Sequence, residues 1–292
     1  MKRYALAFLG STLLSLPCWG QYVITTLNYR GATTTRFVGM NDNFDIVGNY
    51  GLPGQPRHAM MYSRGMFIAL DPTGDLGMNA SAAAQINNRG EISGWYSTGP
   101  GIRHGFVLRD GTVTTIDYPA SSFSQVNGIT DSGTIIGHFV DSAGVFHGYL
   151  LKGGIFSQID LPGALDTLPF DMNVRGDIAG EWDSDPTQLG HAFVQMNSGE
   201  WVSFDAPGAA ANSTLAIGIN DHGEVLGFFR DSSGQGHTFL VNASNLAPEN
   251  YTFPSLPPNA SPETINNSEA FVSFYSDASG IHGLIATPHP SR

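Results

Sequence analysis

Short apolar runs alternate with turn residues along the whole chain, and the same order of runs recurs six times. The third copy is the clearest, with apolar runs over 135–139, 147–151 and 155–159 separated by Asp-Ser-x-Gly and Gly-Gly turns. Gly, Asn and Asp tolerate the positive φ of hairpin turns, so this pattern predicts β-strands. No run favours a helix. Each copy predicts about four strands, namely one ending at an Asn-x-x-Gly turn, one following it, one opening with His and one ending in Asp.

A histidine marks the same point in every copy, at intervals of 46, 43, 44, 46 and 45 residues: His58, His104, His147, His191, His237 and His282. A fixed period of this length indicates stacked copies of one supersecondary unit. Four antiparallel strands in roughly 40 to 50 residues is the size of a propeller blade. An open β-solenoid would need polar caps, and a β-sandwich would not need six copies in register. The sequence therefore predicts an all-β, six-bladed β-propeller with four antiparallel strands per blade.

The two ends of the chain predict closure of the ring. The sixth copy stops after Ile285-Ala286 and lacks its fourth strand, whereas Ile24-Thr25-Thr26-Leu27-Asn28 reads like Val113-Thr114-Thr115-Ile116-Asp117 in the second copy. We expect the N-terminal strand, about residues 22–28, to complete the last blade and to leave only short, protected sheet edges.

The first twenty residues have the pattern of a secretion signal peptide. Lys2 and Arg3 precede an apolar segment over 5–16, and Cys18-Trp19-Gly20 provides a cleavage site near Gly20. Pro17 disfavours a lipid anchor on Cys18. We predict a leader over 1–20, a single propeller domain over 21–292, and a protein that is secreted or extracellular, with the periplasm as the other possible location.

The charge balance excludes several classes of partner. The chain has 13 basic and 25 acidic residues, a formal net charge of −12, and beyond the leader Lys152 is its only lysine. Binding to phosphate backbones needs clustered Lys and Arg, so we expect no nucleic-acid partner. We also expect no membrane anchor and a monomeric protein. Beyond the leader there is no cysteine, which excludes disulfides and thiol chemistry.

The repeated histidines predict framework contacts rather than a metal site. His58, His104 and His147 precede Asp71, Asp117 and Asp160 by 13 residues each, and His191 precedes Asp205 by 14, with Asn28 opposite His282. Each pair would meet across a hairpin as a buried imidazole held by a carboxylate. A catalytic site is formed at one position in the fold, whereas this pair recurs in every copy that has the Asp. We predict no metal, no cofactor and no catalytic residue of a recognisable motif. The repeated Asn41, Asn87, Asn173, Asn220 and Asn266, with Thr130 in the third copy, predict turn-forming side chains.

Function is sought where the copies differ. Two positions before the repeated Asn, on the predicted innermost strand, Gly alternates with Gln85, Asp171 and Thr264, which could form a polar pocket at the channel mouth. A second variable position, on the next strand, carries Trp95, His138 and Glu181. These six side chains are the candidate ligand-binding residues. The negative charge predicts an uncharged or cationic ligand, because no basic group among them would pair an anion.

The recurring pattern Gly-Ile-Asn-Asp-x-Gly-x-Val-x-Gly-x-Phe, His-Ala-Phe and Asp-x-Pro-Gly-Ala resembles the HAF-family extracellular repeat. The segments that carry it are Gly218–Phe229, His191-Ala192-Phe193, Thr114–Asp117 and Asp205–Ala209. The resemblance implies a secreted bacterial repeat protein of propeller type, and it carries over no catalytic residue.

Two function classes fit the sequence. The favoured one is a secreted, non-enzymatic binding or interaction module with a neutral glycan or a protein as ligand. The alternative is a secreted carbohydrate-active hydrolase or lyase at the propeller channel mouth, with acid-base groups drawn from Asp171, Glu181 and His138. Propellers host both, so the arrangement of those three side chains discriminates between them.

Overall fold

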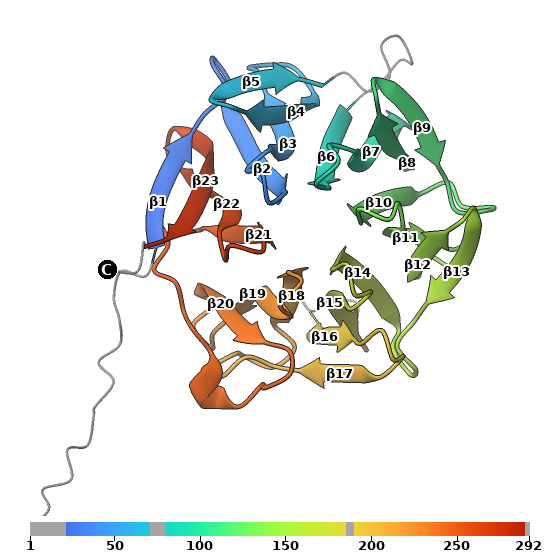
Figure 1. Cartoon of the computed structure of the whole chain (residues 1–292), viewed down its shortest axis with the longest axis vertical. Coiled ribbons are helices and arrows are strands. Elements are labelled where there is room, and N and C mark those ends of the chain that lie inside the picture. The colour runs from blue at the N-terminus through green and yellow to red at the C-terminus, as the bar shows by residue number, and fades with distance from the viewer. Residues whose placement is uncertain (1–21, 71–79, 185–189, 290–292) are drawn as a thin grey trace, which may run out of the picture.

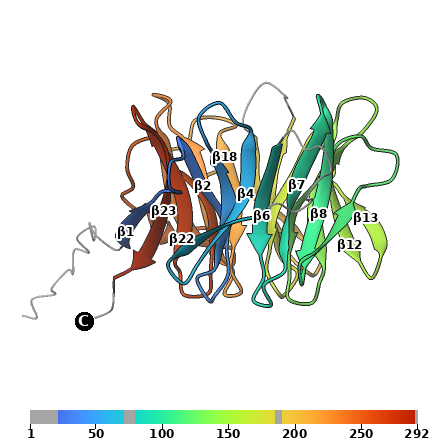
Figure 2. The ribbon, with the colours of Figure 1, turned by 90° about the horizontal axis from the view of Figure 1, so that it is seen from above.

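The chain forms a β-propeller in which small antiparallel sheets stand around a central axis (Figure 1). This computed structural model describes residues 22–70, 80–184 and 190–289. Seen from the edge, the strands run between the two faces of the ring (Figure 2). The predicted leader and Asp71, the expected partner of His58, lie outside the described residues.

Four of the sheets are separate and follow the chain order, each with its first strand at the axis. They comprise β6 (Ala80–Ile86), β7 (Ile92–Gly99), β8 (Ile102–Arg109) and β9 (Thr112–Ile116); β10 (Ser124–Ile129), β11 (Ile135–Val140), β12 (Phe146–Lys152) and β13 (Ile155–Ile159); β14 (Asp166–Met172), β15 (Ile178–Asp183), β16 (His191–Gln195) and β17 (Trp201–Phe204); and β18 (Thr214–Ile219), β19 (Glu224–Arg230) and β20 (Gly236–Asn242).

A fifth, eight-stranded sheet closes the ring. One half contains β2 (Thr34–Met40), β3 (Ile46–Gly51), β4 (Arg57–Ser63) and β5 (Met66–Ala69), and the other contains β21 (Ser261–Ile265), β22 (Phe271–Asp277), β23 (Gly280–Pro288) and β1 (Tyr22–Leu27). The halves meet at a single parallel pair, Thr34 and Ile281. Similar isolated parallel bridges, Arg103 to Phe123 and Gly190 to Ser213, lie between other consecutive sheets.

The prediction of six separate four-stranded sheets needs correction. Among the described residues there are five sheets, because the first and last repeats share one, and the fifth repeat forms only three strands. After β20 the chain makes one turn of 3-10 helix, Pro248–Asn250, where no helix was expected. Thr252 then pairs with Leu240 as an isolated bridge. Pro254 follows, and because it has no N–H to donate, a regular fourth strand does not continue there.

The N-terminal strand β1 supplies the outer strand beside β23. The two pair antiparallel from Tyr22 opposite Pro288 to Leu27 opposite Gly283. Tyr22 packs edge-on against Phe271 of the last repeat, at 5.0 Å between ring centroids. Tyr29, two residues beyond β1, stacks on Tyr50 of the first repeat at 3.8 Å. The N-terminal segment therefore joins the two ends of the ring through both backbone pairing and side-chain packing.

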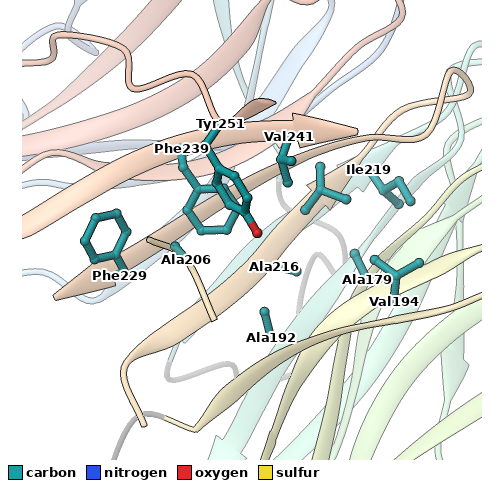
Figure 3. Packing of buried hydrophobic residues seen from close by; sticks show 11 residues of the cluster. Ala179, Ala192, Val194, Ala206, Ala216, Ile219, Phe229, Phe239, Val241 and Tyr251 are labelled. Carbon is teal, nitrogen blue, oxygen red and sulfur yellow. The ribbon is translucent and has the colours of Figure 1, made fainter. Parts of the chain in front are cut away.

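The core lies between neighbouring sheets. Figure 3 shows one such layer, where Phe239 and Val241 from β20 and Ala216 from β18 meet Ala192 and Val194 from β16. Phe239 is fully buried, and it lies across Gly227 on the adjacent strand, where an added Cβ would come within 2.1 Å of the ring. In the second to fifth repeats the glycine of the second strand thus faces the large aromatic side chain two residues after the repeated histidine, whose ring leaves no room for a Cβ.

Six aromatic residues, one on the second strand of each repeat, pack against the repeated histidines. Each forms a cross-strand ring pair with the histidine of its own repeat, with centroids 4.9 to 5.8 Å apart: Tyr50, Tyr96, Phe139, Trp182, Phe229 and Tyr275. The same ring contact therefore occurs in every repeat, and the spacing of the residues alone did not predict it.

Candidate functional site

The repeated histidines form framework contacts. Their Nδ1 atoms lie 2.8 Å from Asp117, 3.0 Å from Asp160 and 2.9 Å from Asp205 for the second, third and fourth repeats. In the sixth repeat, His282 Nδ1 lies 3.0 Å from Asn28 Oδ1. The expectation of buried imidazoles is wrong, because these side chains retain 14 to 26% of their accessible surface. The pairs lie near the rim of the sheets, where water also reaches the carboxylates.

One face of the channel is closed by a ring of repeated asparagines. Each Oδ1 accepts bonds from the backbone N–H groups two and four residues on, as at Asn87 with Arg89 and Glu91, which is the predicted turn. Each Nδ2 also donates to the carbonyl of the equivalent residue in the next repeat, at 3.0 to 3.3 Å. Five such bonds are present, and Thr130 interrupts the ring between the third and fourth repeats.

A second ring is formed by the residues that follow these asparagines. It alternates carboxylates with other side chains: Asp42, Asn88, Asp131, Val174, Asp221 and Asn267. The backbone N–H of one residue donates to the side-chain oxygen of the next at 2.8 to 2.9 Å. Asn88 and Asn267 each also donate Nδ2 to the carboxylates on both sides. Val174 has no such group, so this ring is interrupted at the same junction as the first.

We expect Val174→Asn to complete the second ring and stabilise the protein. Val174 is 59% exposed, so its replacement costs little burial. The new amide would accept from Asp131 N–H and donate to Asp131 and Asp221, as Asn88 does with its neighbours. One or two hydrogen bonds to carboxylates contribute about 1 kcal/mol net, which raises Tm by roughly 2 to 4 °C for a domain of this size. Thermal unfolding measures the change.

Val174→Asp is the matched control. The Asp side chain has the same shape as Asn but places a third carboxylate between Asp131 and Asp221, so we expect no gain in Tm. Equal stabilisation by both substitutions would contradict the role assigned to the amide.

Gln85, Asp171 and Thr264 converge at the channel axis and bond to one another. Gln85 Nε2 donates to Asp171 Oδ1 at 3.4 Å and to Thr264 Oγ1 at 3.1 Å, and Thr264 Oγ1 donates to Asp171 Oδ2 at 3.3 Å. The alternating glycines make this possible, because a Cβ on Gly39 would lie 2.6 Å from the Gln85 Cα. The three side chains, here called the plug, divide the channel. The cavity on the asparagine-ring side is only about 80 Å³.

Asp171 supplies the carboxyl of the plug, and its side chain is buried. Its oxygens also accept from the backbone N–H groups of Met172 at 2.9 Å and Ile219 at 3.2 Å. Burial raises the pKa of Asp171 to about 6, and these hydrogen bonds limit the rise. With four donors already bound, the carboxyl is occupied by the protein itself, so the plug acts as a partition rather than an open pocket.

Beyond the plug lies a larger cavity, here called the channel chamber, of about 280 Å³. Every inner strand has a β-bulge at the same point, and the register skips one residue just before the plug position. The skipped residues all line the chamber: Val38, Ala84, Asn127, Phe170, Ile217 and Glu263. Because a bulge turns two successive residues toward the same side, it adds this second set of inward side chains. Asn127 and Glu263 are the functional candidates that the sequence analysis missed.

Glu263 is the chemically distinctive group of the chamber. Burial raises its pKa to about 8, an effect that the nearby Arg36 partly offsets. The carboxyl is therefore protonated at neutral pH and can both donate and accept a hydrogen bond. Within the described residues, no hydrogen-bond partner is found for it. Neighbouring Ser261 adds a hydroxyl, Gln125, Asn127 and the three plug residues add further polar groups, and the rest of the lining is apolar.

The opposite wall is held by a chain of hydrogen bonds. Arg103 donates to Gln125 Oε1 at 2.6 Å, and Gln125 Nε2 donates to Asn127 Oδ1 at 2.9 Å. Asn127 Nδ2 in turn donates to Pro169 O at 2.6 Å and lies 3.0 Å from His138 Nδ1. Gln125 lines the chamber, and its second amide proton has no acceptor among the described residues. The wall is thus rigid and presents one free donor.

Trp95, His138 and Glu181 lie behind the channel, and none of them lines a cavity described above. Arg103 lies over the Trp95 ring at 4.0 Å. His138 supports Asn127, and burial together with the Arg103 charge lowers the pKa of His138 to about 3. Burial and the charges of Asp183 and Asp166 raise the pKa of Glu181 to about 8. Neither of the two channel cavities is lined by Glu181 or His138, so neither brings these groups together with Asp171, the set required by the hydrolase hypothesis.

Two further features bear on the class of site. Across residues 22–70, 80–184 and 190–289, no three His, Cys, Asp or Glu side chains are grouped in a way that could hold a metal ion. The same residues contain no helix of the length and apolar character needed to cross a membrane.

No protein-family model and no curated protein sequence matches the chain. The fold is similar to solved structures across nearly its whole length. A protein of unknown function from Dyadobacter fermentans has 12% identity over 93% of this chain and 99% of that one, with a TM-score of 0.57. AofleA from Arthrobotrys oligospora has 8% identity over 93% and 94%, with a TM-score of 0.53. The SapL1 lectin in complex with alpha methyl fucoside has 9% identity over 90% and 99%, with a TM-score of 0.55. At these identities the likeness concerns the fold alone.

Proposed function

We propose that the protein is a non-enzymatic binding module whose channel chamber holds one unit of a neutral sugar. The observation that carries this proposal is the Glu263 carboxyl, which lines a cavity of about 280 Å³ and has no hydrogen-bond partner among the described residues. A polar group that is removed from bulk water is costly unless something pairs with it. A bound ligand would supply that partner.

The lining favours a small polyol with an apolar face. Val38, Phe170 and Ile217 provide apolar walls, while Glu263, Ser261 and Gln125 provide hydrogen-bonding groups. A few polar groups fixed on an apolar wall are typical of small-molecule sites, and the volume lies near the lower end of their usual range, about 300 to 1,000 Å³. Sugar hydroxyls both donate and accept, which matches a protonated carboxyl.

The charge of the chamber favours a neutral ligand. Among the described residues, no Arg or Lys lines it, so an anion would be left unpaired. Glu263 is protonated at neutral pH, and the Asp171 carboxyl already accepts four bonds from the protein, so a cation would find no free carboxylate.

Three further proposals concern the choice of sugar, the number of blades, and the repeat family and location of the protein. SapL1, a propeller of similar shape, is a lectin that was solved with alpha methyl fucoside, which makes this sugar a rational first probe. The closing sheet has two four-stranded halves joined by one residue pair, which supports its assignment as two blades in a six-bladed ring. We also propose membership of the HAF-type repeats and secretion after cleavage near Gly20, both from the sequence pattern.

Titration calorimetry with a panel of methyl glycosides tests the proposal. The panel contains α-methyl fucoside and the methyl glycosides of glucose, galactose and mannose. We expect at least one to bind, and Glu263→Ala to weaken that binding by 10- to 100-fold, the equivalent of one or two hydrogen bonds to a buried group. The affinity of the unmodified protein should fall above pH 8, where Glu263 loses its proton and its ability to donate.

Glu263→Gln is the matched control. An amide keeps a donor and an acceptor but does not titrate, so this variant should retain most of the affinity and lose the pH dependence. A panel without any binder, or equal affinity for the protein and its Glu263→Ala variant, would refute the proposal.

A further inference from the structure

A cavity of about 1,060 Å³ lies beside the irregular fourth strand of the fifth repeat. It occupies the space between β20 and the segment 251–261, and is here called the lateral groove. Thr252 alone bridges to β20, donating to and accepting from Leu240 at 2.8 Å each way. The chain beyond Thr252 runs without regular structure as far as β21, which leaves the groove open along one side of β20.

The lateral groove adjoins the channel chamber. Leu215, Ile217 and Ser261 line both cavities. Leu215 and Ile217 belong to the inner strand of the fifth repeat, and Ser261 opens the inner strand of the sixth. The groove therefore reaches from the outer part of the ring to the chamber wall at the junction between these two repeats.

Aromatic rings line the lateral groove. Phe253 is one of these and is 50% exposed. Phe228 also lines the groove: Arg230 lies over its ring at 5.5 Å, and Gly236 on the adjacent strand leaves room for it, since an added Cβ would lie 2.6 Å from the ring. The exposed face of Phe253 is suited to stacking against the apolar face of a planar or ring-shaped ligand.

Unpaired hydrogen-bond donors accompany these rings. Arg230 donates to Gly234 O at 3.1 Å and forms no ion pair with a described carboxylate. His237 contacts Asp231 through Nε2 at 2.8 Å, but its Nδ1 has no partner among the described residues. In the four other repeats whose contacts are described, the same Nδ1 faces an Asp or Asn oxygen. The fifth repeat thus replaces a framework contact with a free imidazole nitrogen in the groove.

We propose that the lateral groove is a second subsite for a linear neutral oligosaccharide, whose terminal unit occupies the channel chamber and whose chain leaves between the fifth and sixth repeats. This proposal rests on the function proposed above and extends the ligand from one sugar to a chain. Phe253 and Phe228 stack against sugar rings, while Arg230 and His237 bond to their hydroxyls. A peptide strand fits less well, because Thr252 already takes the hydrogen-bonding position opposite Leu240 and interrupts the free edge of β20.

Calorimetry on the full chain with matched ligands tests the inference. The probes are the methyl glycoside that binds best and linear hexasaccharides of the same sugar. The hexasaccharide should bind at least tenfold more tightly than the monosaccharide. Phe253→Ala and Arg230→Ala should each weaken hexasaccharide binding about tenfold and leave the monosaccharide affinity unchanged. Ile155→Ala, at an exposed apolar side chain on β13, should change neither.

The outcomes separate the two proposals. Equal affinity for monosaccharide and hexasaccharide, with loss of both in Glu263→Ala, overturns the lateral subsite and leaves the chamber intact. Hexasaccharide binding that Phe253→Ala weakens and Glu263→Ala does not would support the groove and refute the chamber. No binding of either probe overturns both.

Discussion

Deletion of residues 22–28 is expected to lower Tm by more than about 10 °C and to promote aggregation. These residues pair with β23 along six positions, so their loss leaves an unpaired sheet edge. Tyr22, Ile24 and Leu27 also leave the cores of the closing sheet. Full burial of an apolar side chain contributes about 1.5 to 3 kcal/mol, so these three partly buried side chains and the six paired backbone positions together contribute several kcal/mol, and for a domain of this size each kcal/mol corresponds to roughly 2 to 4 °C. Calorimetry and light scattering measure the two effects.

Two point substitutions control for the change of length. Ile24→Ser alters an inward side chain of β1 and should reproduce part of the loss, whereas Val23→Ser alters an outward, 42% exposed one and should have little effect. A monomeric deletion variant with an unchanged Tm would show that β1 does not close the ring.

The free energy of unfolding is expected to fall between pH 6.5 and 8.5. In the folded protein, burial raises the pKa of Glu181 and of Glu263 to about 8. In an unfolded chain the pKa of a Glu is about 4.3. Between these values the folded state holds more protons than the unfolded state, so raising the pH favours unfolding. The loss is about 2 kcal/mol per carboxyl over this range. Chemical denaturation at the two pH values measures it.

The double variant Glu181→Gln/Glu263→Gln isolates this effect from the surface histidines. Its pH dependence should be smaller by about 4 kcal/mol, while Glu249→Gln, at an exposed carboxyl, should behave like the unmodified protein. Identical pH profiles for all three proteins would mean that neither buried carboxyl holds its proton as described.

The repeat made the propeller and many of its framework contacts predictable. Residues that recur at the same spacing in successive copies make the same contact in each, so the His147 and Asp160 pair could be predicted from spacing. The match between residues 24–28 and 113–117 likewise identified β1 as a missing outer strand. The merging of the first and last repeats into one sheet depends on a single pair, Thr34 and Ile281, and leaves no mark in the sequence.

The candidate site was only partly predictable because of the β-bulges. Alternation along the inner strands placed Gln85, Asp171 and Thr264 at the axis, but one extra residue per strand turns the preceding side chain inward as well. The signal that could have revealed it was the presence of Asn127 and Glu263 at a position that is apolar in the other four repeats. Mutual bonding within the plug depends on three-dimensional distance, which spacing does not give.

The position of a bound sugar tests the central claim most directly. A crystal structure of the protein with the best-binding methyl glycoside should place the sugar in the channel chamber, with hydroxyls within hydrogen-bonding distance of Glu263 and the free Gln125 amide. A sugar bound elsewhere on the ring, with Glu263 still unpaired in a chamber that holds no ligand, would contradict the account.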